Sequence, residues 1–204
     1  MNTDIKICGI MDNDVIDVLN KYRPEYIGFV FAQSRRMVTP ARAKELAKLL
    51  HPDIKRVGVF VNESVERMIS IRQWVGLDVM QLHGSESIAL VNRLGGIIWK
   101  ALPGKVDSMV LVQKYLPYVD KIVLDSMTPQ KPGGTSQTFD WRLIDSTAFC
   151  EHLVLAGGLH AGNIKKAMHA LRPSVVDISS GVETDGKKDP EKIRICIEEV
   201  RREP

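Results

Sequence analysis

Eight short runs rich in valine and isoleucine recur along the chain, separated by segments of helical character. The runs are "IKICGI" from Ile5, "YIGFVF" from Tyr26, "RVGVFV" from Arg56, "DVMQLHG" from Asp78, "GIIWKAL" from Gly96, "DKIVLDS" from Asp120, "HLVLAGG" from His152 and "VVDISSG" from Val175. Each run is bounded by Gly, Asp or Asn, which is typical of buried strands. Strand and helix alternating every roughly 25 residues predict a parallel sheet covered by helices.

The segments between the runs have the caps and spacing of amphipathic helices. "TPARAKELAKLL" begins with Thr39 as N-cap and Pro40 at the first helical position. "NESVERMISIRQWV" begins with Asn62 or Ser64 as its cap, and "HAGNIKKAMHALR" and "KDPEKIRICIEEVRR" have the same periodicity. Eight strands alternating with eight helices predict an α/β protein, a single (β/α)8 (TIM) barrel over residues 1–204.

The alternative architecture is an open, doubly wound sheet. That fold usually carries a G-x-G-x-x-G fingerprint for a dinucleotide after its first strand. The corresponding segment here, "KICGIMDND", lacks those glycines. The barrel is therefore favoured.

Composition narrows the class of protein. The chain has 204 residues, 44% of them hydrophobic, which is enough for one sizeable core. Its net charge is +3 and its Lys and Arg are scattered, so we expect no nucleic-acid partner. No apolar run reaches the ~18 residues of a membrane span, so we expect no membrane partner.

The three cysteines, Cys8, Cys150 and Cys196, lie far apart and form no zinc-type pair. We therefore expect a reduced, cytoplasmic protein without a metal site, and the N-terminus does not have the pattern of a signal peptide. Cys196 lies on the apolar side of the last helix, and Cys150 directly precedes a strand. Both are interpreted as packing residues.

Functional side chains of a barrel gather where its strands end, at the carboxyl face. Alternation along the strands places one polar set on the face opposite the helices: Lys6, Cys8, Gln81, His83, Asp125, Asp177 and Ser179. Polar groups are costly to bury without partners. Because Lys6 and Asp177 lie on the first and last strands, which meet when a barrel closes, we expect them to form an interior ion pair.

Distinctive motifs follow one another along the chain: "KICGI", "GFVF" followed by "SRRMV", "VGVFVN", "QLHG", "LDS" with "GGT" and "FDW", "LAGGL", and "VDISSGVE" with "GKKD". With these motifs the chain resembles the phosphoribosylanthranilate isomerase family of tryptophan biosynthesis. Any one of these motifs is a weak signal. Motifs on seven of the eight expected strands, in order and at the spacing of barrel strands, are a strong one.

The resemblance implies an aldose–ketose isomerase, formally an intramolecular oxidoreductase, that performs an Amadori rearrangement by proton transfers without a cofactor. Asp125 matches the general acid that opens the ribose ring, and its site is expected to raise its pKa so that it holds a proton. Cys8 matches the general base that removes the proton from C2 of the sugar, and it must act as a thiolate.

The expected ligand is a small phosphosugar with two anionic ends. Arg36 fits the anthranilate carboxylate, which a guanidinium can bind with two hydrogen bonds. Arg35 stands where the family pattern commonly has proline, which leaves open which of the two arginines contacts the ligand. Phosphate binding is expected from the ends of the seventh and eighth strands, where backbone N–H groups can hold an anion: Gly157, Gly158, Ser180 and Gly181.

Two further features are left open by the sequence. The connection "SMTPQKPGGTSQTFDW" is interpreted as a lid over the sugar, and Ser136 in it replaces the usual glycine of the family. His83 faces the mouth of the barrel and is included among the substrate-binding candidates, although a satisfied strand-end histidine is the simpler interpretation.

Two alternative functions remain at this point. One is a non-catalytic phosphate-binding barrel, which the presence of both Cys8 and Asp125 disfavours. The other is the sugar isomerase of histidine biosynthesis, which has aspartate where this chain has Cys8. For the assembly, we expect a monomer or a weak homo-oligomer.

Overall fold

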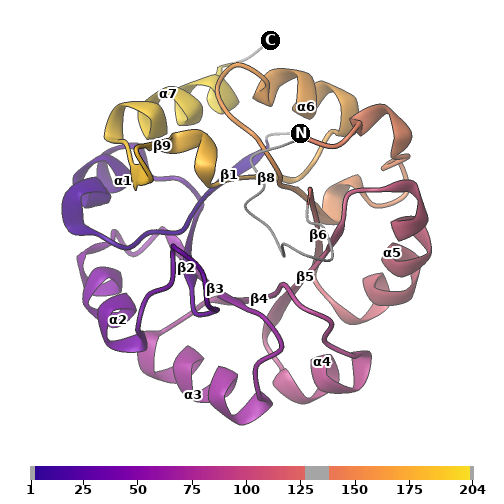
Figure 1. Cartoon of the computed structure of the whole chain (residues 1–204), viewed down its shortest axis with the longest axis horizontal. Helices are drawn as coiled ribbons and strands as arrows, with labels where there is room; N and C mark the ends of the chain where they lie inside the picture. The colour runs from indigo at the N-terminus through magenta and orange to yellow at the C-terminus, as the bar shows by residue number, and fades with distance from the viewer. Residues whose placement is uncertain (1–2, 127–137, 203–204) are drawn as a thin grey trace.

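Eight parallel strands close into a barrel in chain order in the computed structural model, which describes residues 3–126 and 138–202 (Figure 1). The strands are β1 (Asp4–Cys8), β2 (Tyr26–Val30), β3 (Lys55–Phe60), β4 (Val79–Leu82), β5 (Ile97–Pro103), β6 (Lys121–Asp125), β7 (Leu153–Leu155) and β8 (Val175–Ile178). β1 pairs with both β2 and β8, so the first strand closes the barrel against the last. The predicted architecture is confirmed.

The α-helices surround the strands as an outer ring (Figure 1). They are α1 (Ile16–Tyr22), α2 (Pro40–Leu49), α3 (Val65–Val75), α4 (Ile88–Leu94), α5 (Met109–Tyr115), α6 (Ile164–Leu171) and α7 (Pro190–Arg201). Short 3-10 helices supplement them: η1 (Asn13–Val15), η2 (Val106–Ser108), η3 (Leu116–Tyr118), η4 (Trp141–Leu143), η5 (Cys150–His152) and η6 (Ser180–Val182).

The expectation of eight α-helices is wrong for the described part of the chain, which has seven. Between β6 and β7, residues 138–152 contain only η4 and η5. The Asp140 side chain accepts the backbone N–H of Arg142, and Asp145 accepts that of Thr147. Such local bonds compete with helical ones and favour turns.

The predicted helix starts are confirmed. Thr39 caps α2 by accepting the backbone N–H of Arg42, and Pro40 is the first helical residue. Ser64, one of the two candidates, caps α3 by accepting the N–H of Arg67. At α7, the Asp189 side chain accepts the N–H groups of the first turn.

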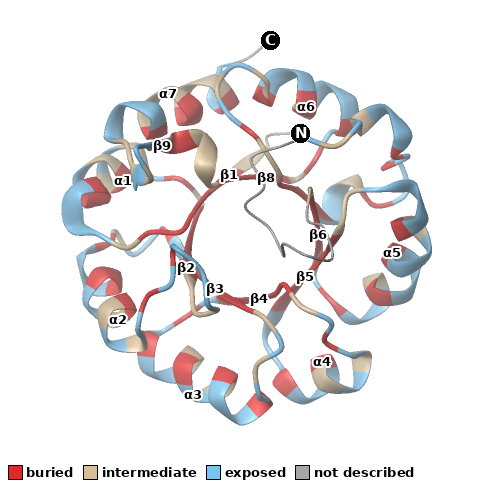
Figure 2. Cartoon of the chain, viewed as in Figure 1, coloured by how far each residue is buried: buried red, intermediate tan, exposed pale blue. Residues whose placement is uncertain are grey.

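Alternating side chains divide the interior into two apolar regions. The larger region lies between the strands and the helices and includes Ile5 and Ile7 of β1. The smaller one fills the barrel itself and includes Tyr26, Val57, Trp99 and others. Buried residues accordingly cover nearly all of the strands (Figure 2). Towards the carboxyl ends of the strands, polar residues replace these apolar ones inside the barrel.

The two cysteines interpreted as packing residues differ. Cys196 is buried in the core on α7, as expected. Cys150 is only half-buried, because it begins the 3-10 turn η5, which leads into β7, so it packs less completely than Cys196. Within residues 3–126 and 138–202, no helix has the length and apolar character needed to cross a membrane. The same residues contain no cluster of three or more His, Cys, Asp or Glu suited to a metal ion.

Candidate active site

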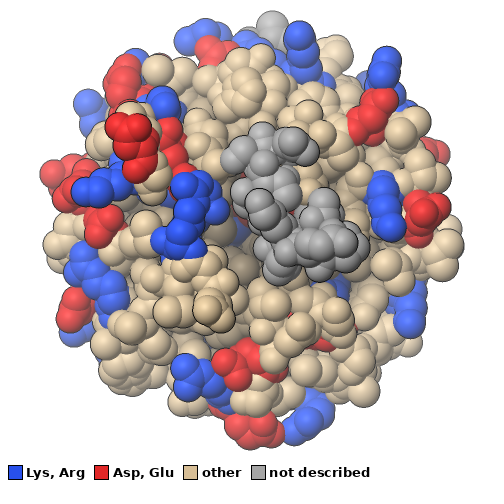
Figure 3. Space-filling view, viewed as in Figure 1, with Lys and Arg blue, Asp and Glu red and all other residues tan. Residues whose placement is uncertain are grey.

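A cavity of about 410 Å³ opens at the carboxyl ends of the strands. Most of the polar side chains predicted to face inward line it, namely Cys8, Gln81, His83, Asp125, Asp177 and Ser179, together with Arg36. Figure 3 shows this face of the molecule, where Lys and Arg side chains reach toward its centre from the side of β2. The cavity therefore has unlike walls, with cations concentrated on one side.

Cys8 ends β1 and is buried beside the cavity. Gly28, its partner across the pairing with β2, leaves room for the thiol, because a Cβ there would lie 2.6 Å from Sγ. Ser179 holds the end of the strand by donating its hydroxyl hydrogen to the Cys8 carbonyl oxygen at 3.0 Å. The thiol is thus held where a ligand in the cavity would meet it.

Beneath Cys8, the predicted interior ion pair is present. Lys6 Nζ donates to Asp177 Oδ2 at 2.6 Å, and Lys6 is fully buried. The two residues are register partners on β1 and β8, which explains how they meet. Burial alone would lower the pKa of Lys6, but Asp177 and Cys8 outweigh it and the pKa is raised, so the lysine stays charged.

Burial raises the pKa of the Cys8 thiol above its ordinary value, and Asp177 acts in the same direction. Lys6 and Lys188 oppose this shift without reversing it. The empty site therefore favours the thiol over the thiolate. A base made from Cys8 must gain its charge from a change brought about by the ligand.

Asp125 ends β6 on another part of the cavity wall. His83 Nε2 lies 3.2 Å from Asp125 Oδ2, close enough for an ion pair although the atoms are not aligned for a hydrogen bond. On its other side, His83 Nδ1 is 3.0 Å from Gln81 Nε2. His83 is therefore a neighbour of the candidate acid as well as part of the cavity wall.

The expected rise in the pKa of Asp125 is wrong for the empty site. Burial does raise this pKa, but His83, the Ser126 N–H and the more distant Lys6 together outweigh burial and lower it. The carboxyl group is accordingly ionised before a ligand arrives. The sequence argument considered burial but not the neighbouring imidazole.

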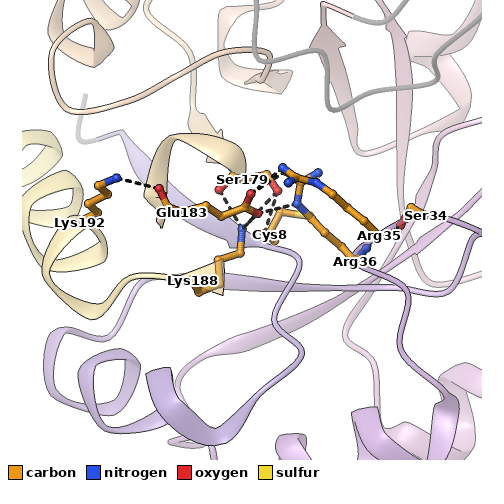
Figure 4. Close-up of polar contacts among 8 residues, drawn as sticks. All are labelled: Cys8, Ser34, Arg35, Arg36, Ser179, Glu183, Lys188 and Lys192. Carbon is orange, nitrogen blue, oxygen red and sulfur yellow. Dashed lines mark hydrogen bonds and ion pairs between the residues drawn. The ribbon is translucent and has the colours of Figure 1, made fainter. Parts of the chain in front are cut away.

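Arg36 lines the cavity, but part of its guanidinium is already engaged (Figure 4). Its Nε and Nη2 donate to the two carboxylate oxygens of Glu183 at 2.6 and 3.1 Å. Arg35 Nη2 and Lys188 Nζ bind the same carboxylate at 2.7 and 3.0 Å. Glu183 and Lys188 were not among the predicted site residues, although both belong to the quoted motifs "SSGVE" and "GKKD".

Three of the four residues expected to hold phosphate line the cavity: Gly157, Gly158 and Ser180. Gly157 and Gly158 have φ angles of +90° and +63°, which few other residues adopt. Gly181 is not among the described residues that line the cavity. A Cβ at that position would lie 1.9 Å from the Leu159 carbonyl oxygen, so its glycine serves close backbone packing.

The model of the N-(5'phosphoribosyl)anthranilate (PRA) isomerase family matches residues 5–199. The chain belongs to this family. It is 42% identical over 202 residues to the isomerase of Clostridium acetobutylicum, covering 97% of this chain and 98% of the relative. The isomerase of Acetivibrio thermocellus is 43% identical over 211 residues, covering 98% and 96% of the two chains.

Solved structures of PRA isomerases have the same fold. The enzyme of Thermotoga maritima matches with a TM-score of 0.87 and 35% identity over 98% of each chain. A phosphoribosyl anthranilate isomerase in complex with reduced 1-(o-carboxyphenylamino)-1-deoxyribulose 5-phosphate matches with a TM-score of 0.84 and 33% identity over the same shares. A 3-hexulose-6-phosphate synthase, at 12% identity and a TM-score of 0.67, shows the fold alone.

Two expectations from the sequence concern Arg35 and the connection after β6. Arg35, which replaces the usual proline, is half-exposed and reaches Glu183, so both arginines converge on one carboxylate. Most of the connection interpreted as a lid, with Gly133, Gly134 and Ser136, lies outside the described residues.

Proposed function

We propose that this chain catalyses the isomerisation of N-(5'-phosphoribosyl)anthranilate to 1-(o-carboxyphenylamino)-1-deoxyribulose 5-phosphate, a step of tryptophan biosynthesis. The observation that carries the proposal is a cavity at the carboxyl face of a family barrel that contains one thiol and one carboxyl group, Cys8 and Asp125. The reaction needs one group to donate a proton to the sugar and another to remove one.

Asp125 acts first, as the general acid. It protonates the ring oxygen of the ribose, the bond from that oxygen to C1 breaks, and C1 becomes part of a protonated Schiff base. Because Asp125 is ionised in the empty site, it must take up its proton as the ligand enters. The ligand displaces water and brings two anionic groups, and both changes raise the pKa of a buried carboxyl group.

Cys8 acts second, as the general base. The Schiff base now carries a positive charge, which lowers the pKa of a neighbouring thiol. Lys6 and Lys188 add to this effect from the protein side. The thiol gives its proton to solvent, and the thiolate removes the proton from C2; the resulting enolamine then tautomerises to the ketone as a proton moves from the C2 hydroxyl group to C1. All of these steps are proton transfers, so the proposal includes no cofactor.

The two anionic ends of the ligand orient it across the cavity. Arg36 is assigned to the anthranilate carboxylate. Phosphate is assigned to the backbone N–H groups at Gly157, Gly158 and Ser180, because the chain after β7 and after β8 presents small residues to the cavity. His83 remains a substrate-binding candidate and lies beside Asp125, so it is assigned to that part of the cavity. The expected small phosphosugar partner fits this arrangement.

The test is turnover of freshly prepared N-(5'-phosphoribosyl)anthranilate by the purified chain, followed as loss of substrate fluorescence. We expect saturable turnover, and none from the double variant Cys8→Ala/Asp125→Ala. A folded wild-type protein without turnover would contradict the proposal. Analytical ultracentrifugation of the same sample tests whether the chain is a monomer or a weak homo-oligomer.

A further inference from the structure

The carboxylate of Glu183 is surrounded by cations on both of its oxygens (Figure 4). Oε1 accepts from Arg36 Nε and Lys188 Nζ, and Oε2 accepts from Arg36 Nη2 and Arg35 Nη2. Only 6% of the Glu183 side chain is exposed, and it is not among the described residues that line the cavity. This carboxylate therefore faces the cations and not a ligand.

The position of Glu183 is fixed without help from Arg36. It begins β9 (Glu183–Thr184), which pairs with the antiparallel β10 (Lys187–Lys188) and places Lys188 opposite Glu183. Asp185 and Gly186 form the turn with φ angles of +51° and +80°, the conformation that a two-residue Asp-Gly hairpin turn adopts. Lys192 at the start of α7 donates to the Glu183 carbonyl oxygen at 2.7 Å.

Arg36 reaches this anchor from a different part of the chain, the connection between β2 and α2. Its aliphatic chain passes Gly9, where a Cβ would lie 2.6 Å from Arg36 Cδ. Glu183 binds the edge formed by Nε and Nη2. A guanidinium carries five N–H donors in a fixed fork, so the donors on Nη1 and the second one on Nη2 are left for another acceptor.

The local charge is suited to an anion. Arg35, Arg36 and Lys188 contribute three positive charges and Glu183 contributes one negative charge, which leaves a surplus of two positive charges. This surplus attracts an anion, but it does not select the direction from which the anion is bound. The geometry of Arg36 provides that selection.

We propose that Glu183 is a positioning residue that holds Arg36 so that the free edge of its guanidinium meets the carboxylate of the substrate. This inference rests on the proposed function, because it assigns a role to that carboxylate. It divides the work within the cluster: Arg35 and Lys188 supply charge, and Glu183 supplies orientation.

Orientation and charge predict opposite results for Glu183→Gln. If Glu183 only offsets positive charge, the variant has a larger positive surplus and binds an anionic ligand more tightly. If Glu183 orients Arg36, the variant binds more weakly, because one of the two accepting oxygens becomes an NH2 group, which cannot accept from the guanidinium.

The experiment is isothermal titration of wild type and Glu183→Gln with two ligands: the reduced product analogue and its counterpart without the ring carboxylate. We expect about a tenfold loss of affinity, or more, for the carboxylate-bearing ligand, since a charged hydrogen bond is being misaligned. We expect little change for the counterpart. In steady-state kinetics, KM should rise more than kcat falls.

Two further variants make the result specific. Glu66→Gln is the matched control, because Glu66 also binds an arginine, Arg93, at 2.7 Å but on the exposed surface of α3, and it should leave both affinities unchanged. In the double variant Arg36→Ala/Glu183→Gln, the second substitution should cost nothing further, since the residue that it positions is gone.

Three outcomes overturn the inference. Tighter binding by Glu183→Gln assigns the residue to charge balance alone. An equal loss for both ligands, accompanied by a fall in melting temperature, assigns it to the stability of the fold. A wild-type protein that binds neither ligand and turns over no substrate overturns the proposed function, and this inference with it.

Discussion

The two walls of the cavity that hold the proposed base, Cys8, and the proposed acid, Asp125, are built differently. Cys8 lies among charges contributed by β1, β8 and the β9–β10 hairpin, with Lys6 and Lys188 both acting on its thiol. Asp125 lies on β6, and within residues 3–126 and 138–202 the titratable side chain that forms an ion pair with it is His83, which follows β4. The wall around Cys8, the network wall, is a network of several charges. The wall around Asp125, the pair wall, consists of Asp125 and His83.

The comparison shows that the number of neighbouring charges does not decide an ionisation state. Two lysines fail to overcome the burial of Cys8, and its pKa remains raised. At Asp125, His83 at 3.2 Å is the largest of the effects that overcome burial, and the pKa is lowered. Distance and burial together determine the result. For the roles proposed here, both groups are in the opposite protonation state before the ligand binds, so the proposed mechanism requires the ligand to change the state of both.

The largest effects are expected when the proposed base and the proposed acid are each replaced by alanine. Cys8→Ala and Asp125→Ala should each lower kcat by about 10²- to 10⁴-fold, the usual contribution of a positioned acid or base. Steady-state kinetics on the two variants, with binding of the reduced product analogue, gives the measurement. Cys150→Ala is the matched control, since that cysteine is half-buried away from the cavity. Near-normal turnover by Cys8→Ala would show that Cys8 is a packing residue and not the base.

The network wall should also be the one on which the fold depends. Lys6→Met leaves Asp177 as an unpaired buried charge, which typically costs 3–5 kcal/mol, and we expect about 3 because Asp177 borders the cavity. Urea unfolding measures the loss. The double variant Lys6→Met/Asp177→Leu removes both charges and should recover part of it. A stable single variant would show that water already solvates Asp177.

Arg35 and Arg36 both lie at the rim of the network wall, and their alanine variants should show which of them binds the carboxylate of the substrate. Arg36→Ala should lower kcat/KM by about 10- to 150-fold, corresponding to the ~1.5–3 kcal/mol of a charged hydrogen bond. Arg35→Ala should have a smaller effect, because 56% of the Arg35 side chain is exposed and a surface pair is worth about 1 kcal/mol or less. The reverse order of effects would assign the substrate carboxylate to Arg35.

The smallest expected effect is on the pH dependence of stability, and it comes from the contact between Asp125 and His83. The lowered pKa of Asp125 contributes stability that is present above its ordinary value of 3.8 and is lost as the pH falls through the folded-state pKa. In His83→Asn, burial dominates and the pKa should rise, so the stability difference between wild type and variant should grow as the pH rises from acid. Carboxyl carbon NMR of Asp125 reports the shift directly. An unchanged pKa would show that His83 carries no charge that Asp125 senses.

The features that depend only on strand period and strand order were predictable from the sequence. Alternation in "IKICG" placed Lys6 and Cys8 on the inner face, and the closing of the first strand against the last paired Lys6 with Asp177. Both inferences need only the two-residue period of a strand and the topology of a barrel. The cavity wall could be anticipated for the same reason.

The rest depended on distances that a sequence does not contain. Arg36 and Glu183 are 147 residues apart, and no periodicity links the β2–α2 connection to the hairpin after β8. The lowered pKa of Asp125 depends on the approach of His83 across the barrel from β4 to β6, strands that are not neighbours in the sheet. In residues 138–152, the described part of the connection after β6, 3-10 turns take the place of the expected helix; the local side-chain bonds to the backbone that favour them are not visible in the regular spacing of the strands.

Because β1 pairs with β8, the barrel cannot close until the last strand has been synthesised. Lys6 and Asp177 are 171 residues apart, so during synthesis the first strand leaves the ribosome with one edge unpaired and a lysine that has no counterion. At roughly 5–20 residues per second, about 10–30 s pass before Asp177 is made. For that time the nascent barrel has an open edge that can pair with another chain. The Cys8 thiol, which we propose as the base, ends this first strand and takes its place beside Asp177 only when the last strand arrives.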